Sequence, residues 1–350
     1  MKDNSKTLVI FSPAFPANEQ DNWLPWLQNI ILAMNNDFPE LKIIVFSFKY
    51  PNHTHSYKWK GNEIFSFGSK RKNKMATLLS RARIFFAFKK INKANKIAGV
   101  LSIWCGECAY LAKICTRSTG IKHFTWIVGQ DARAGNEYVK KIQPDGRQLV
   151  AMSDFLQAEF YRNYKIKPAH IIPTGINTSL YKTELIEKTI DILGVGSLSP
   201  LKQYDVFIDV IDAIKKRMPN IRTEICGGGE EKDSLQKKID SHSLQENILL
   251  HGELPHAEVT IKMQQSKILL HTSMYEGFGN IYLEALYGGA HVIGFTKAMN
   301  EAIKNWHVVR SKEEMIEKAI SLLTDNNTRY ERVLYHTYNE TAAKLVSLFV

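Results

Sequence analysis

The sequence predicts an α/β protein built from two doubly wound parallel sheets, and three observations support this. Short apolar runs alternate with segments of helical length and period, as in βαβ folds. The alternation occurs twice, on either side of the polar stretch TELIEK at residues 183–188. Several of the apolar runs end in glycine-containing turns. A length of 350 residues suits two such domains.

The first half contains five candidate strands and two clear candidate helices. TLVIF at residues 7–11 is mostly apolar and is followed by Ser-Pro, which is typical of a buried parallel strand. The same criterion predicts the other strands, at residues 42–48, 99–104, 123–128 and 148–152. Helical periodicity covers residues 23–34 and 75–90.

The second half repeats this pattern. Strands are expected at residues 191–195, 221–226, 247–251, 267–271 and 291–295, and helices at 204–218, 231–241 and 281–288. Residues 313–323 and 327–349 are helical in period, with no strand after them. We therefore expect an N-terminal Rossmann-like domain at residues 1–185, a C-terminal one at 186–326 and a final helix at 327–350 that crosses back to the first domain.

Composition narrows the class of protein. No apolar run reaches the ~18 residues of a membrane-spanning helix, and the first fifteen residues lack the pattern of a signal peptide. Four cysteines are too few for a disulfide scaffold. The sequence therefore predicts a cytoplasmic protein.

The positive charge is concentrated in one segment. Lys and Arg total 46 against 35 Asp and Glu, a net charge of +11, yet no acidic residue lies between Glu63 and Glu107. Residues 70–96 hold ten basic residues, among them Arg81, Lys89 and Lys90, interleaved with apolar residues at helical spacing. Such a helix suits an anionic membrane surface. The alternative is a core helix with a solvated basic face, and no motif indicates nucleic-acid binding.

The strongest cluster of functional residues is the segment YEGFGNIYLEAL, residues 275–286. Its glycines follow an apolar strand and lead into a helix, so the backbone can approach a ligand closely and the helix start favours phosphate. Glu276 and Glu284 are placed to reach one ligand, and carboxylates suit the hydroxyl groups of a sugar. The alternative is a tight turn with solvated glutamates.

Two more glycine turns follow strands in the second half. In GVGSLSPLK, residues 194–202, the amides of Gly196 and Ser197 and the ammonium of Lys202 would form a diphosphate clamp. The turn GGGE, residues 227–230, contributes Gly228 and Glu230. All three turns open at the carboxyl edge of the predicted sheet, where α/β folds bind ligands.

The succession of these motifs resembles a known family. G-x-G-S-L-x-P-x-K, G-G-G-E, H-G-x-x-P-H and E-G-F-G-x-x-x-x-E-A occur in the order found in retaining glycosyltransferases of family 4, which have the GT-B fold. The match covers residues 191–295, with weaker echoes at 151–160 and 171–181. It implies two facing Rossmann-like domains with a cleft between them, the first binding the acceptor and the second the nucleotide sugar.

The resemblance also implies a role for each donor-site residue. Glu276 would bind the hydroxyls of the donor sugar and Glu284 those of the ribose, while Lys202 would hold the diphosphate. The amides of Gly196 and of residues 277–279 (Gly277, Phe278 and Gly279) would cradle the phosphates beside Asn280. The loop containing Leu254 would lie against the base.

This sequence departs from the family pattern at several positions. Ser197 stands where the family usually has Arg, and Ser-Pro-Ala-Phe-Pro at residues 12–16 replaces a glycine-rich acceptor loop. Val128 stands where the family has a catalytic His, which leaves Gln130 and Asp131 as the nearest polar candidates. The chain after residue 295 is also shorter than usual.

The predicted function is transfer of a sugar, with retention, from a nucleoside-diphosphate sugar to a lipid-linked saccharide in surface polysaccharide synthesis. This places the protein peripherally on the inner face of the cell membrane. No Asp-x-Asp pair occurs, so we expect no metal requirement and no other cofactor. The alternatives are a GT-B epimerase, a phosphorylase of the same fold, and a non-catalytic protein that binds nucleotide sugar or membrane.

A cysteine pair and one histidine complete the candidate residues. Cys105 and Cys108 form a CxxC, which we interpret as a pair of buried thiols because neither Cys115 nor Cys226 has suitably spaced partners for zinc. His271 immediately precedes the donor loop and is a minor candidate for that site.

Overall fold

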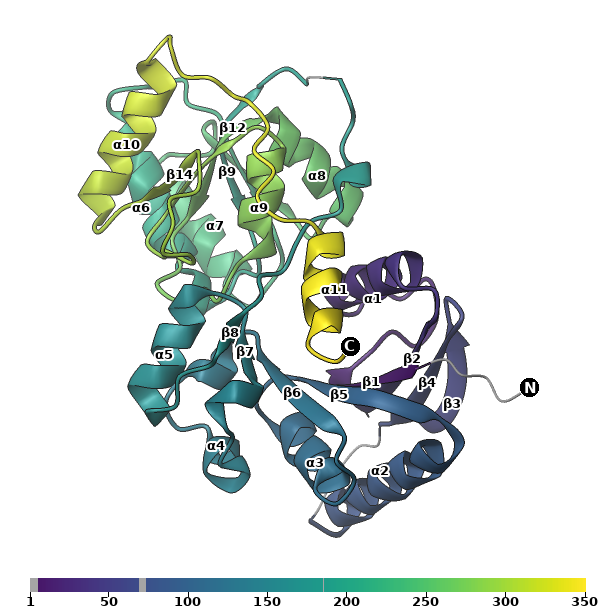
Figure 1. The fold of residues 1–350 in the computed structure, drawn as a ribbon. Helices are drawn as coiled ribbons and strands as arrows, with labels where there is room; N and C mark the ends of the chain where they lie inside the picture. Colours follow the sequence, from purple (N-terminus) through teal and green to yellow (C-terminus); the bar gives the residue numbers. More distant parts are fainter. Residues whose placement is uncertain (1–5, 69–73, 185) are drawn as a thin grey trace. The chain divides into compact units, whose positions relative to one another are not determined.

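The computed structural model describes residues 6–68, 74–184 and 186–350, which form two compact units (Figure 1). Unit 1 combines Met1–Gly175 with Tyr338–Val350, and unit 2 is Ile176–Thr337. Both are sheets flanked by helices, as the sequence predicts.

The sheet of unit 1 has the strand order β3-β4-β2-β1-β5-β6-β7-β8. All neighbours are parallel except β3 and β4, which form an antiparallel pair at one edge. The strands are β1 (Lys6–Ala14), β2 (Leu41–Tyr50), β3 (Thr54–Trp59), β4 (Asn62–Phe67), β5 (Lys96–Ile103), β6 (Lys122–Ile127), β7 (Leu149–Ala151) and β8 (His170–Ile171). The chain enters the sheet at β1 and extends from it in both directions, so the topological switch point lies between β1 and β5.

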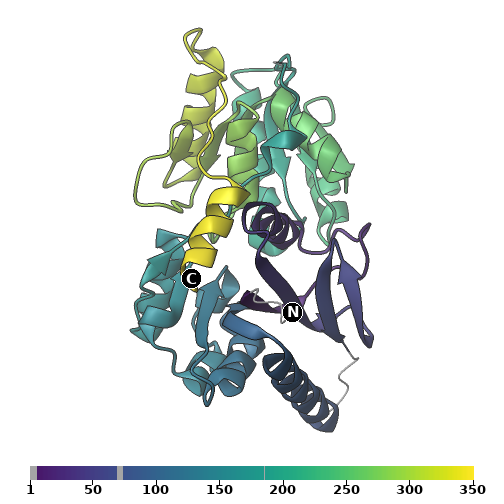
Figure 2. The same ribbon diagram turned by 45° about the vertical axis from the view of Figure 1, so that its right-hand side comes forward.

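Helices cover both faces of this sheet (Figures 1 and 2). They are α1 (Pro25–Asp37), α2 (Lys74–Ala94), α3 (Glu107–Thr116), α4 (Glu137–Ile142), α5 (Asp154–Tyr164) and α11 (Tyr338–Ser347). On one face, Phe11, Phe46 and Phe88 pack in the core, with the Phe11 and Phe46 rings stacked at 5.1 Å. The β3–β4 hairpin was missed by the sequence analysis because β3 is polar and mostly exposed.

Unit 2 contains a six-stranded, fully parallel sheet with the order β11-β10-β9-β12-β13-β14. The strands are β9 (Ile190–Val195), β10 (Thr223–Cys226), β11 (Ile248–Gly252), β12 (Ser266–His271), β13 (His291–Gly294) and β14 (Trp306–Val308). The helices are α6 (Tyr204–Lys215), α7 (Lys232–Ser241), α8 (His256–Gln265), α9 (Asn280–Tyr287) and α10 (Lys312–Thr324). Fully buried Phe207, Ile211 and Ile268 lie in its core, which explains the apolar runs of the central strands.

The boundary between the units lies earlier than residues 185/186. Ile176 pairs with Thr337 in an isolated bridge, and the Tyr181 hydroxyl donates to the carbonyl of Glu284 at 3.0 Å. Residues 176–184 therefore belong to unit 2 although they form no strand of its sheet, which is why the sequence pattern did not assign them there.

The last helix belongs to unit 1. The Thr341 hydroxyl donates to the carbonyl of Pro173 at 2.9 Å, and the Phe349 ring packs edge-on against Phe124 at 5.3 Å. Gly99 leaves room for this ring, since a Cβ there would lie 2.0 Å from Phe349.

Helix α11 is shorter than the periodicity predicts. A helix over residues 327–349 is wrong for its first part, because residues 328–336 have no regular structure. Aromatic side chains there pack individually on unit 2: Tyr335 lies against Phe278 and Tyr330 against His291. These contacts require an extended backbone and override the local helical pattern.

Candidate functional site

The carboxyl edge of the sheet in unit 2 carries two interlocked glycine loops. The amide of Leu198 donates to the carbonyl of Gly228 at 2.8 Å, which ties the loop after β9 to the loop after β10. A Cβ at Gly227 would lie 1.8 Å from the carbonyl oxygen of Gly196, and one at Gly229 would lie 2.2 Å from that of Leu198. These glycines therefore allow two loop backbones to pack against each other.

Lys202 and Glu276 form the charged centre of this edge. Lys202 ends the short 3-10 helix Pro200–Lys202, and its ammonium lies 2.5 Å from the Glu276 carboxylate. The two side chains are 18% and 20% exposed. Residues 74 positions apart in sequence thus meet where the loops after β9 and β12 converge. The arrangement holds a cation and an anion together at this edge of the sheet.

Two hydroxyl residues hold these loops in place, and the sequence analysis missed both. Thr272 donates to the carbonyl of either Lys202 or Gln203, each at 2.8 Å. Ser273 Oγ lies 3.0 Å from the carbonyl of Leu201. Their position directly before the Tyr-Glu-Gly-Phe-Gly loop was a usable signal, because short hydroxyl side chains there can bond to a neighbouring backbone.

Glu284 lies on α9 with its side chain largely buried, and it has a partner that sequence reasoning assigned to no role. His256, at the start of α8, places Nε2 3.2 Å from Glu284 Oε1. This hydrogen bond raises the pKa of His256 above its usual value, while partial burial opposes the shift. The pair joins the helix after the Leu254 loop to the helix that carries Glu284.

One expected phosphate contact is used within the protein, and the structure adds a packing role for the Phe278 side chain. The Gly196 amide, predicted to cradle phosphate, donates to the carbonyl of Cys226 at 3.0 Å. Phe278 is 3% exposed and packs with Trp306 and Tyr335, so its buried side chain anchors the loop of residues 275–279 to the core of unit 2.

The remaining predicted donor residues lie on the loops and helix ends of the same edge. Ser197 and Glu230 are exposed, and Leu254 and Gly228 are half-buried. Gly277 and Gly279 are buried in the loop that leads to Asn280, the first residue of α9.

In unit 1, Asp131 is a buried anchor for two loops. Its carboxylate accepts backbone N–H groups from Cys105 at 2.8 Å and Gly129 at 2.9 Å, with a longer one from Val128 at 3.3 Å. Burial raises its pKa to about 6 against the opposing effect of these hydrogen bonds. Its catalytic role stays a prediction, as does that of the exposed Gln130 next to it.

A cavity of about 240 Å³ lies near the switch point of the unit 1 sheet. Its walls are mainly apolar, with Lys49 and Glu107 as charged groups; the lining residues are Pro13, Phe48, Lys49, Ile103, Trp104, Gly106, Glu107, Cys108 and Tyr138. Trp104 has a φ of 65°, a left-handed conformation that bulky residues rarely adopt. Strained residues of this kind concentrate at functional sites.

Arg81 connects this cavity to α2. Its Nε donates to Glu107 at 2.9 Å, and a second guanidinium nitrogen lies 3.2 Å from the hydroxyl of Tyr138. Arg81, which the sequence assigned to a membrane or acceptor surface, thus supports two lining residues of the cavity.

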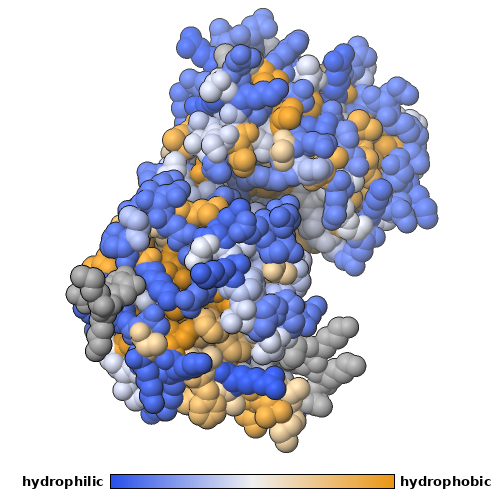
Figure 3. All heavy atoms as spheres, turned by 90° about the vertical axis from the view of Figure 1, so that its right-hand side faces the viewer, coloured by the Kyte–Doolittle hydropathy of each residue, from blue (hydrophilic) through white to orange (hydrophobic). Residues whose placement is uncertain are grey.

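Helix α2 has a buried face and an exposed apolar face. Ser80, Ile84, Phe88 and Ile91 point into the core. The exposed apolar residues are Met75, Leu78, Leu79 and Phe86, each more than half exposed. Exposed basic residues accompany them, including Lys89 and Lys90, and the helix contains no acidic residue. In Figure 3, hydrophobic residues lie at the surface among hydrophilic ones over the lower part of the view. Residues 70–72 of the basic segment lie outside the described residues.

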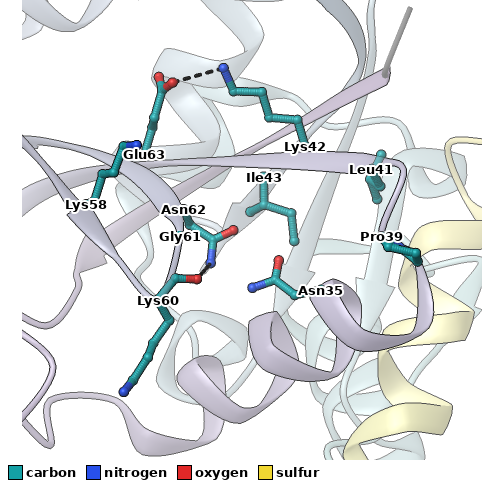
Figure 4. A pocket seen from close by; sticks show the side chains of 10 residues that line it. All are labelled: Asn35, Pro39, Leu41, Lys42, Ile43, Lys58, Lys60, Gly61, Asn62 and Glu63. Atoms are coloured by element: carbon teal, nitrogen blue, oxygen red, sulfur yellow. Dashed lines mark hydrogen bonds and ion pairs between the residues drawn. The ribbon is translucent and has the colours of Figure 1, made fainter. Parts of the chain in front are cut away.

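A second cavity, of about 350 Å³, lies beside the amino end of β2 and the β3–β4 turn (Figure 4). It contains Lys42, Lys58 and Lys60. Lys42 pairs with Glu63 at 2.9 Å, and Lys60 pairs with Glu19 at the same distance. Two of its three cations are therefore paired within the protein, and the cavity is remote from the carboxyl ends of the strands.

The cysteines are buried rather than arranged around a metal. All four are free thiols, and burial raises the pKa of Cys115 to about 12 and that of Cys226 to about 11. Among the described residues, no cluster of three or more His, Cys, Asp or Glu side chains is arranged to hold a metal ion. The helices within the described ranges include none long and apolar enough to cross a bilayer.

Comparison with known proteins identifies the domain that carries this site. Residues 177–340 match the family model "Glycosyl transferases group 1". Unit 2 is a group 1 glycosyltransferase domain. Lys202, Glu276 and Glu284 lie within the matched residues, and their roles in donor binding stay predictions.

The relatives of this domain include subunits of N-acetylglucosaminyltransferases. In Arabidopsis thaliana, a protein of the phosphatidylinositol N-acetylglucosaminyltransferase is 28% identical over 174 residues. The match covers 46% of this chain and 39% of that protein, so the chain spans less than half the length of this relative.

Solved structures place both units in the GT-B fold. A glycosyltransferase from Rickettsia africae superposes with a TM-score of 0.70 at 18% identity, covering 99% of this chain and 98% of that one. Anabaena HepE, solved with UDP and glucose, gives a TM-score of 0.66 at 14% identity, covering 98% and 95%. At these identities the likeness establishes the fold alone.

Proposed function

We propose that this protein transfers a sugar from a nucleoside-diphosphate sugar to a saccharide acceptor in surface polysaccharide synthesis. The observation that carries the proposal is the Lys202–Glu276 ion pair at one sheet edge of a group 1 glycosyltransferase domain. Glu284 lies on α9, the helix that follows the Glu276 loop. A cation for the diphosphate lies beside a carboxylate for the sugar hydroxyls, and a second carboxylate is available for the ribose.

The chemical demand of this reaction is stabilisation of the departing nucleoside diphosphate. Lys202 would neutralise charge that develops on the leaving oxygen, helped by the positive end of α9. Glu276 would accept hydrogen bonds from the donor sugar and fix its orientation. Tight placement of the reacting carbon lowers the entropic part of the barrier.

Retention of configuration and independence of metal belong to the same proposal. A lysine ammonium and a helix terminus can supply the charge stabilisation that a divalent ion provides in other enzymes. We expect transfer to continue at full rate in EDTA. Loss of activity that Mg²⁺ or Mn²⁺ restores would contradict this part of the proposal.

The acceptor is proposed to bind in the cavity of unit 1 that contains Trp104, Glu107 and Tyr138. Aromatic side chains can pack against the apolar faces of a sugar ring, while Lys49 and Glu107 offer polar partners. The exposed apolar and basic residues of α2 support a lipid-linked acceptor at an anionic membrane surface, with the protein bound peripherally on its inner face.

Substitution of Glu276 tests the donor site. Glu276→Ala should reduce kcat/KM by at least about a hundredfold, since it removes a charged hydrogen-bond partner of the sugar. Transfer from radiolabelled nucleotide sugars to membrane extracts measures this, with circular dichroism to confirm folding. Glu246→Ala, which removes an exposed carboxylate elsewhere in unit 2, is the control. A fully active Glu276→Ala protein would exclude this donor site.

The same assay separates the alternative reactions. An epimerase would convert the nucleotide sugar with no acceptor present, and a phosphorylase would depend on inorganic phosphate. A protein that only binds would show a nucleotide-induced rise in Tm without turnover.

Charge reversal on α2 tests the membrane surface. Lys89→Glu with Lys90→Glu should lower binding to vesicles of phosphatidylglycerol and phosphatidylcholine by about tenfold or more, because each basic residue near such a surface contributes about 1 kcal/mol. Lys232→Glu with Lys237→Glu, two exposed lysines of α7, is the matched control. Unchanged co-sedimentation of the α2 variant would favour a merely solvated basic face.

A further inference from the structure

His271 ends β12 close to the Lys202–Glu276 pair, and one of its ring nitrogens has no hydrogen-bond partner among the described residues. The residue is 4% exposed, and its Nδ1 lies 2.7 Å from the Tyr282 hydroxyl. Nε2 is buried without a hydrogen bond among the described residues and lies 3.8 Å from Glu276 Oε2. A buried polar nitrogen left unsatisfied typically costs about 1–3 kcal/mol. Such a group in a ligand site points to a role in the loaded state.

The protonation of His271 follows from its surroundings. Burial, reinforced by the nearby Lys202 charge, lowers its pKa to about 3, so the ring is neutral in ordinary buffers. A neutral imidazole carries one N–H, and the adjacent Glu276 carboxylate favours its position on Nε2. Nδ1 then accepts a hydrogen bond from the Tyr282 hydroxyl. The unsatisfied group is thus a donor directed toward Glu276.

Lys202 has two competing partners in the proposed reaction. In this structure it pairs with Glu276 at 2.5 Å, whereas a bound diphosphate would present more negative charge on several oxygens. Drawing Lys202 to the diphosphate would leave Glu276 without the cation that now holds it. A movement of about 1 Å by the carboxylate would bring it within hydrogen-bond distance of His271 Nε2.

We propose that His271 is a positioning residue of the donor site, whose Nε2–H holds Glu276 in place of Lys202 once nucleotide sugar binds. This inference rests on the proposed function. A neutral donor suits the task, because it orients the carboxylate without neutralising it. Glu276 keeps its full charge for the hydroxyls of the donor sugar, and Lys202 becomes available for the diphosphate.

Binding measurements with UDP and UDP-sugars test this exchange. His271→Leu should leave the Kd for UDP within about twofold, since UDP lacks the sugar. It should weaken binding of UDP-glucose or UDP-N-acetylglucosamine, whichever the native protein prefers, by about tenfold. His271→Gln, which retains an N–H donor, should recover part of the loss. His291→Leu replaces another buried histidine of unit 2 and should not change the ratio of the two Kd values.

A second substitution shows whether the effect passes through Glu276. In a Glu276→Ala background, which removes the acceptor, His271→Leu should cause little additional loss, because the two residues act as one unit. If His271→Leu weakens the binding of UDP and of UDP-sugar equally, His271 has a purely structural role. If the binding of both is unchanged, His271 has no role in the donor site. Either result overturns the inference.

The tautomer of His271 provides a test that needs no ligand. Nitrogen-15 NMR of the native protein should show a neutral ring protonated on Nε2 from pH 5 to 8. Protonation on Nδ1 would overturn the inference even if the protein binds nucleotide sugars. Failure of the native protein to bind any nucleotide, with the expected tautomer present, would instead reject the proposed function and with it this role.

Discussion

At the scale of single residues, the proposed donor site consists of side chains whose partners come from distant loops. Sequence motifs identified Lys202, Glu276 and Glu284 because each lies at a recognisable glycine turn or helix start. The contact of Glu284 with His256 could not be predicted from the motifs, because it depends on how α8 and α9 pack.

The His256–Glu284 pair predicts a small, pH-dependent contribution to stability. The pKa of His256 is raised in the folded protein, so the contribution is full below about pH 6.5 and disappears as the pH rises through the higher folded pKa. His256 is half-exposed, which limits the effect to under about 1 kcal/mol, or about 2 °C in Tm. Calorimetry from pH 5.5 to 8.5 should show His256→Gln less stable than the native protein only at the acidic end.

A double variant provides the control for this prediction. In a Glu284→Gln background, His256→Gln should no longer change the pH dependence. A difference between native and His256→Gln proteins that grows with rising pH would contradict the assigned pair.

At the scale of elements, α2 shows that one helix can have two apolar faces. The sequence contains the apolar positions Met75, Leu78, Leu79 and Phe86 but does not say which face the core. The structure buries Ile84 and Phe88 instead and leaves the first set exposed. Packing against the sheet decides between the faces, because only one can meet the strands.

Substitution of two phenylalanines separates the roles of these faces. Phe88→Ala should destabilise the protein by about 3–5 kcal/mol, because Phe88 is fully buried. Phe86→Ala should change stability by less than about 0.5 kcal/mol, since Phe86 is 66% exposed, but should reduce vesicle binding. Urea denaturation and vesicle sedimentation measure the two effects. Strong destabilisation by Phe86→Ala would show that this face packs against protein.

At the scale of the whole molecule, the chain completes unit 1 only after unit 2. The last thirteen residues, Tyr338–Val350, return to unit 1, where Leu345 and Phe349 are buried. Unit 1 therefore depends on residues that are distant in sequence, and a fragment ending at Gly175 lacks part of its core.

Loss of packing in α11 should affect one unit selectively. Leu345→Ala should lower the stability of unit 1 by about 2–5 kcal/mol, because the side chain is fully buried. Calorimetry with and without UDP distinguishes the two unfolding transitions, because nucleotide binding should raise the Tm of unit 2 only. The other transition should shift to lower temperature in Leu345→Ala and stay unchanged in Lys344→Ala. A selective shift of the UDP-sensitive transition would contradict this assignment.

The sequence alone determined the two α/β sheets, most of their parallel strands and the motif residues of the proposed donor site. Buried parallel strands are continuous apolar runs, and ligand turns at their ends need glycine, so both leave a local record. The polar edge strand β3, the extended residues 328–336 and the unit boundary at Gly175 left no such record. The tertiary structure alone decided that the Gly196 amide is used within the protein and that His271 faces Glu276. These features arise from packing between segments far apart in the chain, which no local pattern contains.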